Sequence, residues 1–248
     1  MKIFLKTVLF LFIFTAGFFL LRQTVYYNID LLASDLGGVT YLYSTVGVIF
    51  AIFAAFVILF EAERWNSLVD AVKGEAGELK ELWLWSRHLP KRLQENFNED
   101  IKQYLEVLIK EEWTDSEKGQ KNKRMETALQ SLHLDIYKIL REAPDLMATA
   151  FSTFSDLIRY REKRIHYAAF GLPRVLKGTL IFSDVLVIAL SFLIAVHNQF
   201  LAYLFVGSIA TLGYVIYLLI DDMDHPTRPG GWRITTKDYE ELLGKIKV

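Results

Sequence analysis

The stretch VTYLYSTVGVIFAIFAAFVILF, at residues 39–60, contains no charged residue and decides the class of the protein. A helix needs about 20 apolar residues to cross the hydrocarbon core of a bilayer, and this stretch is long enough. Backbone groups at that depth must be hydrogen-bonded within the protein, which a continuous helix achieves. Residues 39–60 are therefore expected to form a transmembrane helix.

Three further apolar blocks lie at residues 7–21, 176–196 and 200–220. The first block is short for a span, and the lysines before it also fit a signal peptide. No small-x-small cleavage pattern follows it closely, so a retained helix is expected. Only a few residues separate the last two blocks, which predicts a tight helical hairpin. Hydrophobic residues make up 52% of the 248-residue chain, and four spans account for their concentration.

No helix breaker follows residue 60, and apolar residues continue at helical spacing through residues 61–89. Pro90 ends this stretch, because the residue before a proline is pushed out of helical geometry. The sequence thus predicts one continuous helix over residues 39–89. Further helices are expected at residues 91–113 and 124–142, and from Pro144 to residue 170, with a charged loop at 114–123. Their apolar faces would let them pack as a bundle.

Basic residues set the expected orientation, because cytoplasmic segments near a membrane are enriched in Lys and Arg. They flank the apolar blocks on the side of the long central segment: Arg64, Lys73, Lys80, Arg159, Arg161, Lys163, Arg164, Arg174 and Lys177. The expected fold is an all-α polytopic membrane protein with four transmembrane helices in a 2+2 layout. Helices 1 and 2 lie within residues 1–60 and helices 3 and 4 within 174–220. A cytoplasmic helical bundle at 61–173 lies between the pairs, a cytoplasmic tail spans 221–248, and both termini are cytoplasmic. The expected location is the inner (plasma) membrane of a bacterium.

Composition argues against several classes of function. The chain has no cysteine, which excludes disulfides and thiolate metal sites, and its five histidines lack zinc-site spacing. A net charge of −1 does not favour a nucleic-acid partner. No phosphate-cradling glycine loop or Ser-His-Asp arrangement is evident, so we expect neither an enzyme nor an organic cofactor.

Several different short motifs follow one another along the chain after the first block. They are Trp65-Asn66, Glu75-Ala76, Leu89-Pro90, Glu112-Trp113, Arg161-x-x-Arg164, Leu172-Pro173, Asp224-x-Pro226 and Gly230-Gly231. With these motifs in this order, the sequence resembles the bestrophin-like membrane family of bacteria and plants, from about residue 45 to the end.

Bestrophins are pentameric anion channels whose second helix lines a narrow apolar neck, and animal members bind calcium through acids after the last span. The resemblance implies a homo-oligomer, with a pentamer favoured, that conducts ions passively through a pore lined by the second helix. It favours anions. The alternative is a non-conducting membrane scaffold or sensor whose cytoplasmic domain binds a partner.

The second span offers two candidate pore faces. Gly47, Ala51 and Ala55 recur every fourth residue and would let another helix approach closely. If that row packs inward, the opposite row faces lipid or a pore: Ile49, Phe53, Phe56 and Phe60. A rival stripe matches the bestrophin neck when Trp65 is aligned with the neck's tryptophan: Val48, Ile52 and Phe56. Phe56 belongs to both, and a ring of such side chains would form a constriction that gates by dewetting.

Four aspartates are candidate sites near or within the spans. Asp184 lies inside the third span, where a carboxylate is costly and usually faces a partner or a water-filled cavity. A structural hydrogen bond or an interfacial position is the alternative. Asp221, Asp222 and Asp224 follow the last span and could bind calcium, a hard cation that takes carboxylate oxygens, or could simply be solvated.

Two charged groups border the inner membrane face. Acidic residues follow the second span and could form rings that favour cations, or a solvated helix face: Glu61, Glu63, Glu75, Glu78 and Glu81. A basic run precedes the third span: Arg159, Arg161, Lys163 and Arg164. It would attract anionic lipid head groups or line an ion-attracting vestibule.

Overall fold

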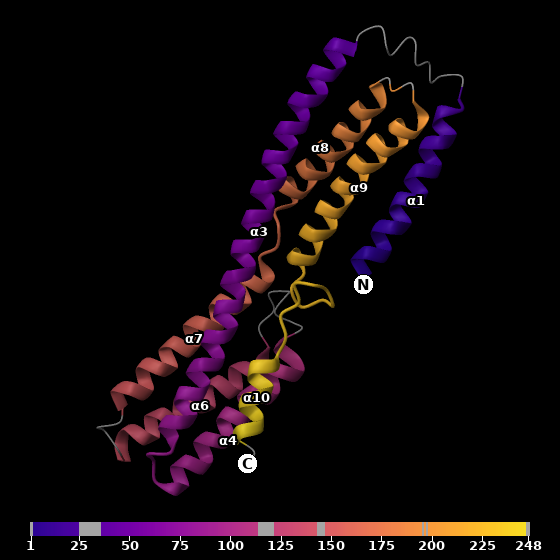
Figure 1. Cartoon of the computed structure of the whole chain (residues 1–248). Helices are drawn as coiled ribbons and strands as arrows, with labels where there is room; N and C mark the ends of the chain where they lie inside the picture. Colours follow the sequence, from indigo (N-terminus) through magenta and orange to yellow (C-terminus); the bar gives the residue numbers. More distant parts are fainter. Residues whose placement is uncertain are drawn as a thin grey trace. The chain divides into compact units, whose positions relative to one another are not determined.

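The computed structural model describes residues 2–24, 36–113, 122–142, 147–194, 196 and 198–246. Within these segments every regular element is helical, which confirms the all-α prediction (Figure 1). The helices are α1 (Lys2–Arg22), α3 (Leu36–Ser86), α4 (Lys91–Val107), the π-helical turn η1 (Leu108–Glu112), α6 (Lys123–Glu142), α7 (Met147–Ala169), α8 (Arg174–Leu193), α9 (Gln199–Asp224) and α10 (Lys237–Ile246). Most of the expected loop at 114–123 and the expected helix start at Pro144 lie outside the described residues.

The chain divides into two compact units. The first comprises Met1–Ala62 and Leu172–Asp224, and the second comprises Glu63–Gly171 and His225–Val248. The predicted continuous helix is confirmed, because α3 runs for 51 residues and contributes to both units. Prolines mark the starts of two helices as expected: Pro90 precedes α4, and Pro173 precedes α8.

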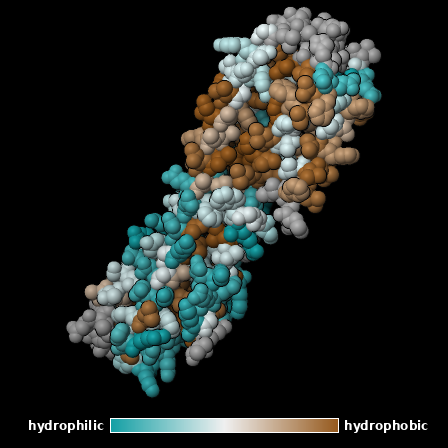
Figure 2. All heavy atoms as spheres, in the orientation of Figure 1, coloured by the Kyte–Doolittle hydropathy of each residue, from teal (hydrophilic) through white to brown (hydrophobic). Residues whose placement is uncertain are grey.

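The four apolar blocks of the sequence, at residues 7–21, 39–60, 176–196 and 200–220, lie in the first unit. Four helical stretches are long and apolar enough to cross a membrane: Phe4–Arg22, Gly37–Ser86, Ala148–Leu193 and Gln199–Asp224. Figure 2 shows hydrophobic residues over the surface of this unit and hydrophilic ones over much of the second. Contiguous exposed apolar surface of this kind marks contact with lipid or with other chains.

Helix α9 is the centre of packing in the first unit, where it contacts both α1 and α8. Its buried positions include Gly207, Ala210 and Gly213, and small residues let neighbouring helices approach closely. Phe10 of α1 stacks on Tyr214 of α9 with ring centroids 4.1 Å apart. A smaller core joins α3 to this group through Ala54 and Val57.

The second unit has a conventional hydrophobic core. Buried side chains from α3, α4, α6, α7 and α10 form it, and the fully enclosed ones include Leu79, Phe97, Leu105, Leu132 and Leu157. Tyr160 of α7 packs against α3 at Gly74, where a Cβ atom would come within 2.5 Å of the tyrosine ring. A side chain at position 74 would therefore push the two helices apart.

The second unit also holds a pair of carboxyl groups at the contact of α4 with α6. Asp100 is hydrogen-bonded to Asp135, which is nearly buried and pairs with Lys138 at 2.7 Å. Burial, followed by the charge and hydrogen bond of Asp135, raises the pKa of Asp100 from 3.8 to about 6. Asp100 therefore keeps its proton to a higher pH than an ordinary aspartate does.

This pair predicts a stability change between about pH 4 and pH 6. The folded state holds a proton there that the unfolded state releases, so stability falls as pH rises through this window. We expect a loss of about 1 kcal/mol, because the partly exposed site is screened by solvent. Melting temperatures of Asp100→Asn in detergent should lose this slope, whereas Glu99→Gln, an exposed neighbour, should keep it. An unchanged slope in Asp100→Asn would contradict the assignment.

Candidate functional site

One side of α3 in the first unit is not covered by any of the residues that the structure describes. The large exposed apolar residues in its middle part include one helical stripe, with Ile49 beside it: Val48, Ile52, Phe56 and Leu59. Ala51 and Ala55 are exposed as well. The stripe carries only apolar side chains, and the small-residue row runs alongside it.

This arrangement corrects the first of the two candidate pore faces. Phe53 and Phe60 are partly buried and pack on the core of the first unit, so they do not share the exposed side with Phe56. The row of alanines does not pack inward as assumed. The reason is geometric, since core residues Ala54 and Val57 fix which side of the helix turns inward. The rival stripe, which contains Val48 and Ile52, is the exposed one.

Asp184 lies in the middle of α8 and faces α9. A Cβ atom at Gly213 would overlap its carboxylate, so the acid occupies the notch left by this glycine. Its Oδ1 atom is buried and makes no hydrogen bond within the described part of the chain. The expected structural hydrogen bond is therefore not found there, and Asp184 borders a cavity of about 470 Å³ instead.

The acids at the end of α9 are organised by a lysine. Lys177 Nζ lies 3.1 Å from Asp221 Oδ1 and 3.5 Å from Asp224 Oδ2. The other oxygen of Asp224 accepts a hydrogen bond from the Leu172 backbone N–H at 2.7 Å. Among the described residues no group of three or more acids, histidines or cysteines is arranged to hold a metal. These two acids tie the start of α8 to the end of α9.

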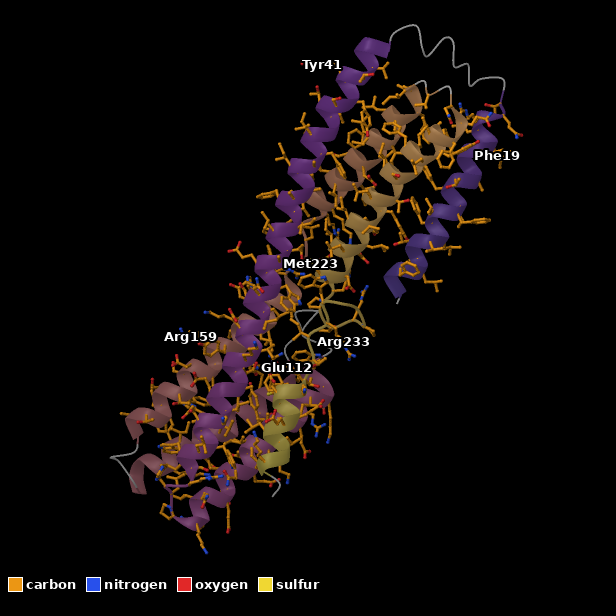
Figure 3. All side chains as sticks on the ribbon, viewed as in Figure 1. Phe19, Tyr41, Glu112, Arg159, Met223 and Arg233 are labelled. Carbon is orange, nitrogen blue, oxygen red and sulfur yellow. The ribbon has the colours of Figure 1, made fainter. Side chains whose placement is uncertain are left out.

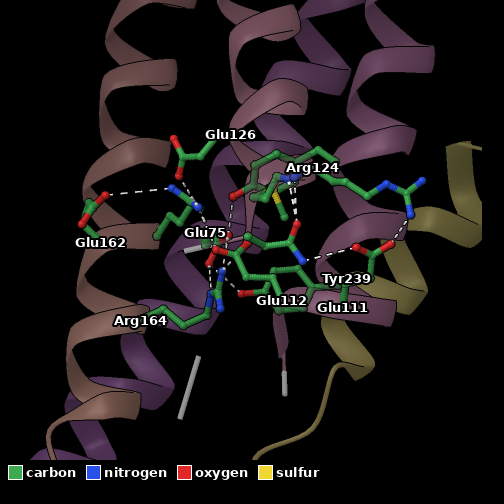
Figure 4. A network of polar contacts seen from close by, with 12 residues as sticks. Glu75, Glu111, Glu112, Arg124, Glu126, Glu162, Arg164 and Tyr239 are labelled. Carbon is green, nitrogen blue, oxygen red and sulfur yellow. Dashed lines mark hydrogen bonds and ion pairs between the residues drawn. The ribbon is translucent and has the colours of Figure 1, made fainter. Parts of the chain in front are cut away.

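A buried network of charges occupies the interior of the second unit (Figure 4). Arg164 Nε donates to Glu75 Oε2 at 2.5 Å, and Arg161 Nη2 donates to Glu112 Oε1 at 2.7 Å. Tyr104 and Tyr239 both donate their hydroxyls to Glu75, at 2.5 Å and 3.0 Å. These residues come from α3, α4, η1, α7 and α10, so one network connects five elements.

The buried positive and negative charges of the network balance one another. Its two buried arginines face two fully buried glutamates, and Arg161 also reaches the half-exposed Glu126 at 2.9 Å. Burial opposes the charge on Arg164, but Glu75 outweighs it and holds the pKa of Arg164 well above its ordinary value. Burial, followed by the charge of Glu75, raises the pKa of Tyr104 and Tyr239 well above 10, so both remain hydrogen-bond donors.

The network corrects three of the predicted surface sites. Arg161 and Arg164 were expected at lipid heads or a vestibule, yet both are enclosed and paired within the protein. Glu75 likewise does not belong to an exposed acidic face. The physical reason is that opposite charges fall on the inward faces of α3 and α7, where pairing offsets the cost of burial. In Figure 3 Glu112 lies among the helices of this unit, whereas Arg159 projects from α7 and pairs with Asp156 at 2.9 Å.

The other predicted acids also differ in how far they are buried. Glu61 is fully buried in the first unit, and therefore does not contribute to an exposed face either. Glu63 and Glu81 are exposed and Glu78 is half-buried. Only part of the expected acidic surface therefore exists.

Two residues with structural importance were not singled out by the sequence. Arg64 donates to the carbonyls of Phe170 and Tyr167, at 2.7 Å and 3.2 Å, and so caps the end of α7. Trp65 was used only for alignment, but its indole N–H donates to the Trp232 carbonyl at 2.7 Å and fixes the tail. The adjacency of an arginine and a tryptophan beyond the second span was the available signal.

Comparisons with known proteins agree with this geometry. The family model of the Bestrophin-like domain matches residues 9–228. A crystal structure of a bacterial bestrophin homologue from Klebsiella pneumoniae, carrying one substitution, superimposes with a TM-score of 0.76 at 13% identity, covering 99% of this chain and 97% of that one. A second variant of the same homologue gives 0.74 at 13% identity, covering 99% of both chains. No curated protein matches the sequence.

Proposed function

Since the chain belongs to the Bestrophin-like family of membrane proteins, we propose that it assembles into a homo-oligomeric channel for passive ion flow, without catalysis. The pore is lined by the exposed stripe of α3. A pentamer is favoured, as the resemblance to bestrophins implies. The likeness to solved bestrophin homologues at 13% identity supports the shared fold. The exposed stripe of α3 is what supports a pore.

The proposal is supported by two neighbouring rows of side chains on α3, one of small residues and one of larger apolar residues. Ala51 and Ala55 offer a surface on which a helix of a neighbouring copy can approach closely. With that row in the contact between copies, the adjacent stripe of Val48, Ile52 and Phe56 turns toward the symmetry axis. Repeated around the axis, it forms a narrow apolar constriction.

The proposed sign of the ion rests on the bestrophin resemblance and on the burial of two of the predicted acids. Rings of glutamate at the inner mouth would favour cations, but Glu61 and Glu75 are buried and cannot contribute to such rings. The constriction itself carries no charge. We therefore propose anions as the conducted ions, in agreement with the bestrophin resemblance.

Flux through liposomes tests the function directly. Purified protein reconstituted with a chloride-sensitive dye inside the vesicles should accelerate chloride entry, and a potassium-sensitive dye should report less entry of potassium. Protein-free vesicles set the baseline. Entry at the baseline rate for both ions would reject the channel and favour the scaffold or sensor.

The proposed topology places both termini and residues 61–173 in the cytoplasm of a bacterium, with the chain in the inner membrane. Because the chain has no cysteine, single cysteines report accessibility without background. We expect a membrane-impermeant maleimide to label Gln23→Cys in intact spheroplasts, and to label Gln130→Cys or Lys237→Cys only after lysis. Labelling of all three before lysis, with a cytoplasmic marker protected, would contradict this orientation.

A further inference from the structure

The cavity beside Asp184 is the feature of the first unit that the channel proposal does not use. It measures about 470 Å³ and is bordered by α1, α3, α8 and α9. This volume falls within the range of small-molecule sites. Its lining is apolar and aromatic, and among the described lining residues Asp184 alone is charged.

The carboxyl group of Asp184 is short of partners in this setting. Its Oδ1 atom is shielded from solvent and lacks a hydrogen bond among the described residues. Lys177, on the same helix, is already held by Asp221 at 3.1 Å. A buried carboxylate without a counter-charge is unfavourable, and at the middle of a membrane helix it usually marks a functional site.

Aromatic rings line the same cavity as this acid. Phe10 and Phe14 of α1 are stacked with centroids 5.7 Å apart, and Phe10 continues onto Tyr214. Phe14 stacks on Phe192 of α8 at 6.1 Å. These stacked rings form an apolar wall on which the hydrocarbon part of a ligand can pack.

From the lone acid, the aromatic wall and the free volume, we infer that this cavity binds a lipophilic amine. The ammonium group pairs with Asp184, and the hydrocarbon part fills the space between the aromatic side chains. A charge-assisted hydrogen bond would satisfy the buried oxygen. The ligand enters from the membrane, since the surrounding helices are those apolar enough to span it. This site is separate from the α3 stripe, and it stands whether or not the protein conducts.

Gly213 determines where along α8 and α9 the site can form. The notch at Gly213 lets the carboxyl group of Asp184 lie against α9. A larger side chain at position 213 would displace the acid. The sequence thus combines an intramembrane carboxylate with the one residue type that leaves space for it.

Binding is tested with dodecylamine, which is positively charged at neutral pH, and with dodecanol as its neutral counterpart. Thermal unfolding of the purified protein in nonionic detergent, titrated with each compound, gives an apparent affinity. We expect dodecylamine to raise the melting temperature of the natural protein and dodecanol to do so much less. Asp184→Asn should bind dodecylamine about tenfold more weakly, whereas Ser183→Ala, its neighbour, should bind normally.

Two further variants separate the site from simple loss of folding. Asp184→Glu keeps the charge and should retain binding. Ala189→Phe keeps Asp184 but fills the cavity that Ala189 lines, and should lose binding. Equal binding of dodecylamine and dodecanol would mean that the cavity binds alkyl chains without recognising the ammonium group, and would overturn the proposal. Undiminished binding by Asp184→Asn would overturn it as well.

Discussion

Glu75→Gln is expected to destabilise the protein by about 3–5 kcal/mol, although the side chain keeps the same number of heavy atoms. In the native protein Glu75 is fully buried and accepts hydrogen bonds from Arg164, Tyr104 and Tyr239. Removing its charge leaves the enclosed guanidinium of Arg164 dependent on Glu112, which lies farther away at 3.5 Å and already pairs with Arg161 at 2.7 Å. An amide also presents donors where the tyrosine hydroxyls need an acceptor.

The measurement is the free energy of unfolding from denaturant titration in detergent, with tryptophan fluorescence as the signal. Glu81→Gln is the matched control, because it makes the same change at an exposed position of the same helix. Substitutions at such positions usually stay within about 0.5 kcal/mol of the natural protein.

A double variant separates the buried charge from other causes. Glu75→Gln with Arg164→Met removes both opposite charges, so it should recover part of the stability lost by the single change. A loss of less than about 1 kcal/mol of unfolding free energy in Glu75→Gln would contradict the role of Glu75 as a buried counter-charge. So would a loss in the double variant that equals the sum of the losses in the two single variants.

Much of the fold could be predicted from the sequence because its signals are local. A helix over residues 39–89 follows from the lack of a breaker, and α3 confirms it. Prolines at 90 and 173 gave the helix starts. The apolar blocks likewise predicted the four segments that can span a membrane.

The charge network was not predicted because it depends on distant pairs. Arg164 and Glu75 are separated by 89 positions, and neither helix alone shows that they meet. A signal did exist, since Arg161 and Arg164 lie on the same face of α7 as buried Leu157 and Ala168. The prediction equates charge with exposure, which fails when an inward-facing charge pairs with an opposite charge inside the protein. The π-helical turn η1, which carries Glu112, has no comparable signature in the sequence.

The direction of the proposed pore face could not be predicted for a different reason. Residues 39–60 are apolar on every side, so their pattern does not indicate which side packs on the protein. Only the contacts of Phe53 and Phe60 with the core separate the two stripes. The same difficulty applies to any helix that contacts lipid on one side and protein on the other.

Phe56→Ala is expected to increase ion flux severalfold and to weaken selectivity between chloride and potassium. Phe56 is 56% exposed within the chain, so its truncation leaves no large internal cavity and should cost little stability. In the proposed oligomer the same change removes a bulky apolar ring from the constriction. A wider constriction stays hydrated more easily, so the barrier to ion entry falls.

The control for this change is Phe12→Ala on α1, where the phenylalanine is 75% exposed and lies on an apolar helix away from α3's stripe. Both variants lose the same atoms from an exposed apolar surface, so a general effect on insertion or lipid contact should appear in both. A rise in flux confined to Phe56→Ala assigns the ring to the conduction path. Phe53→Ala should instead lower the melting temperature, because Phe53 packs on the core. Flux and selectivity unchanged in Phe56→Ala, at equal protein content, would remove this stripe from the pore.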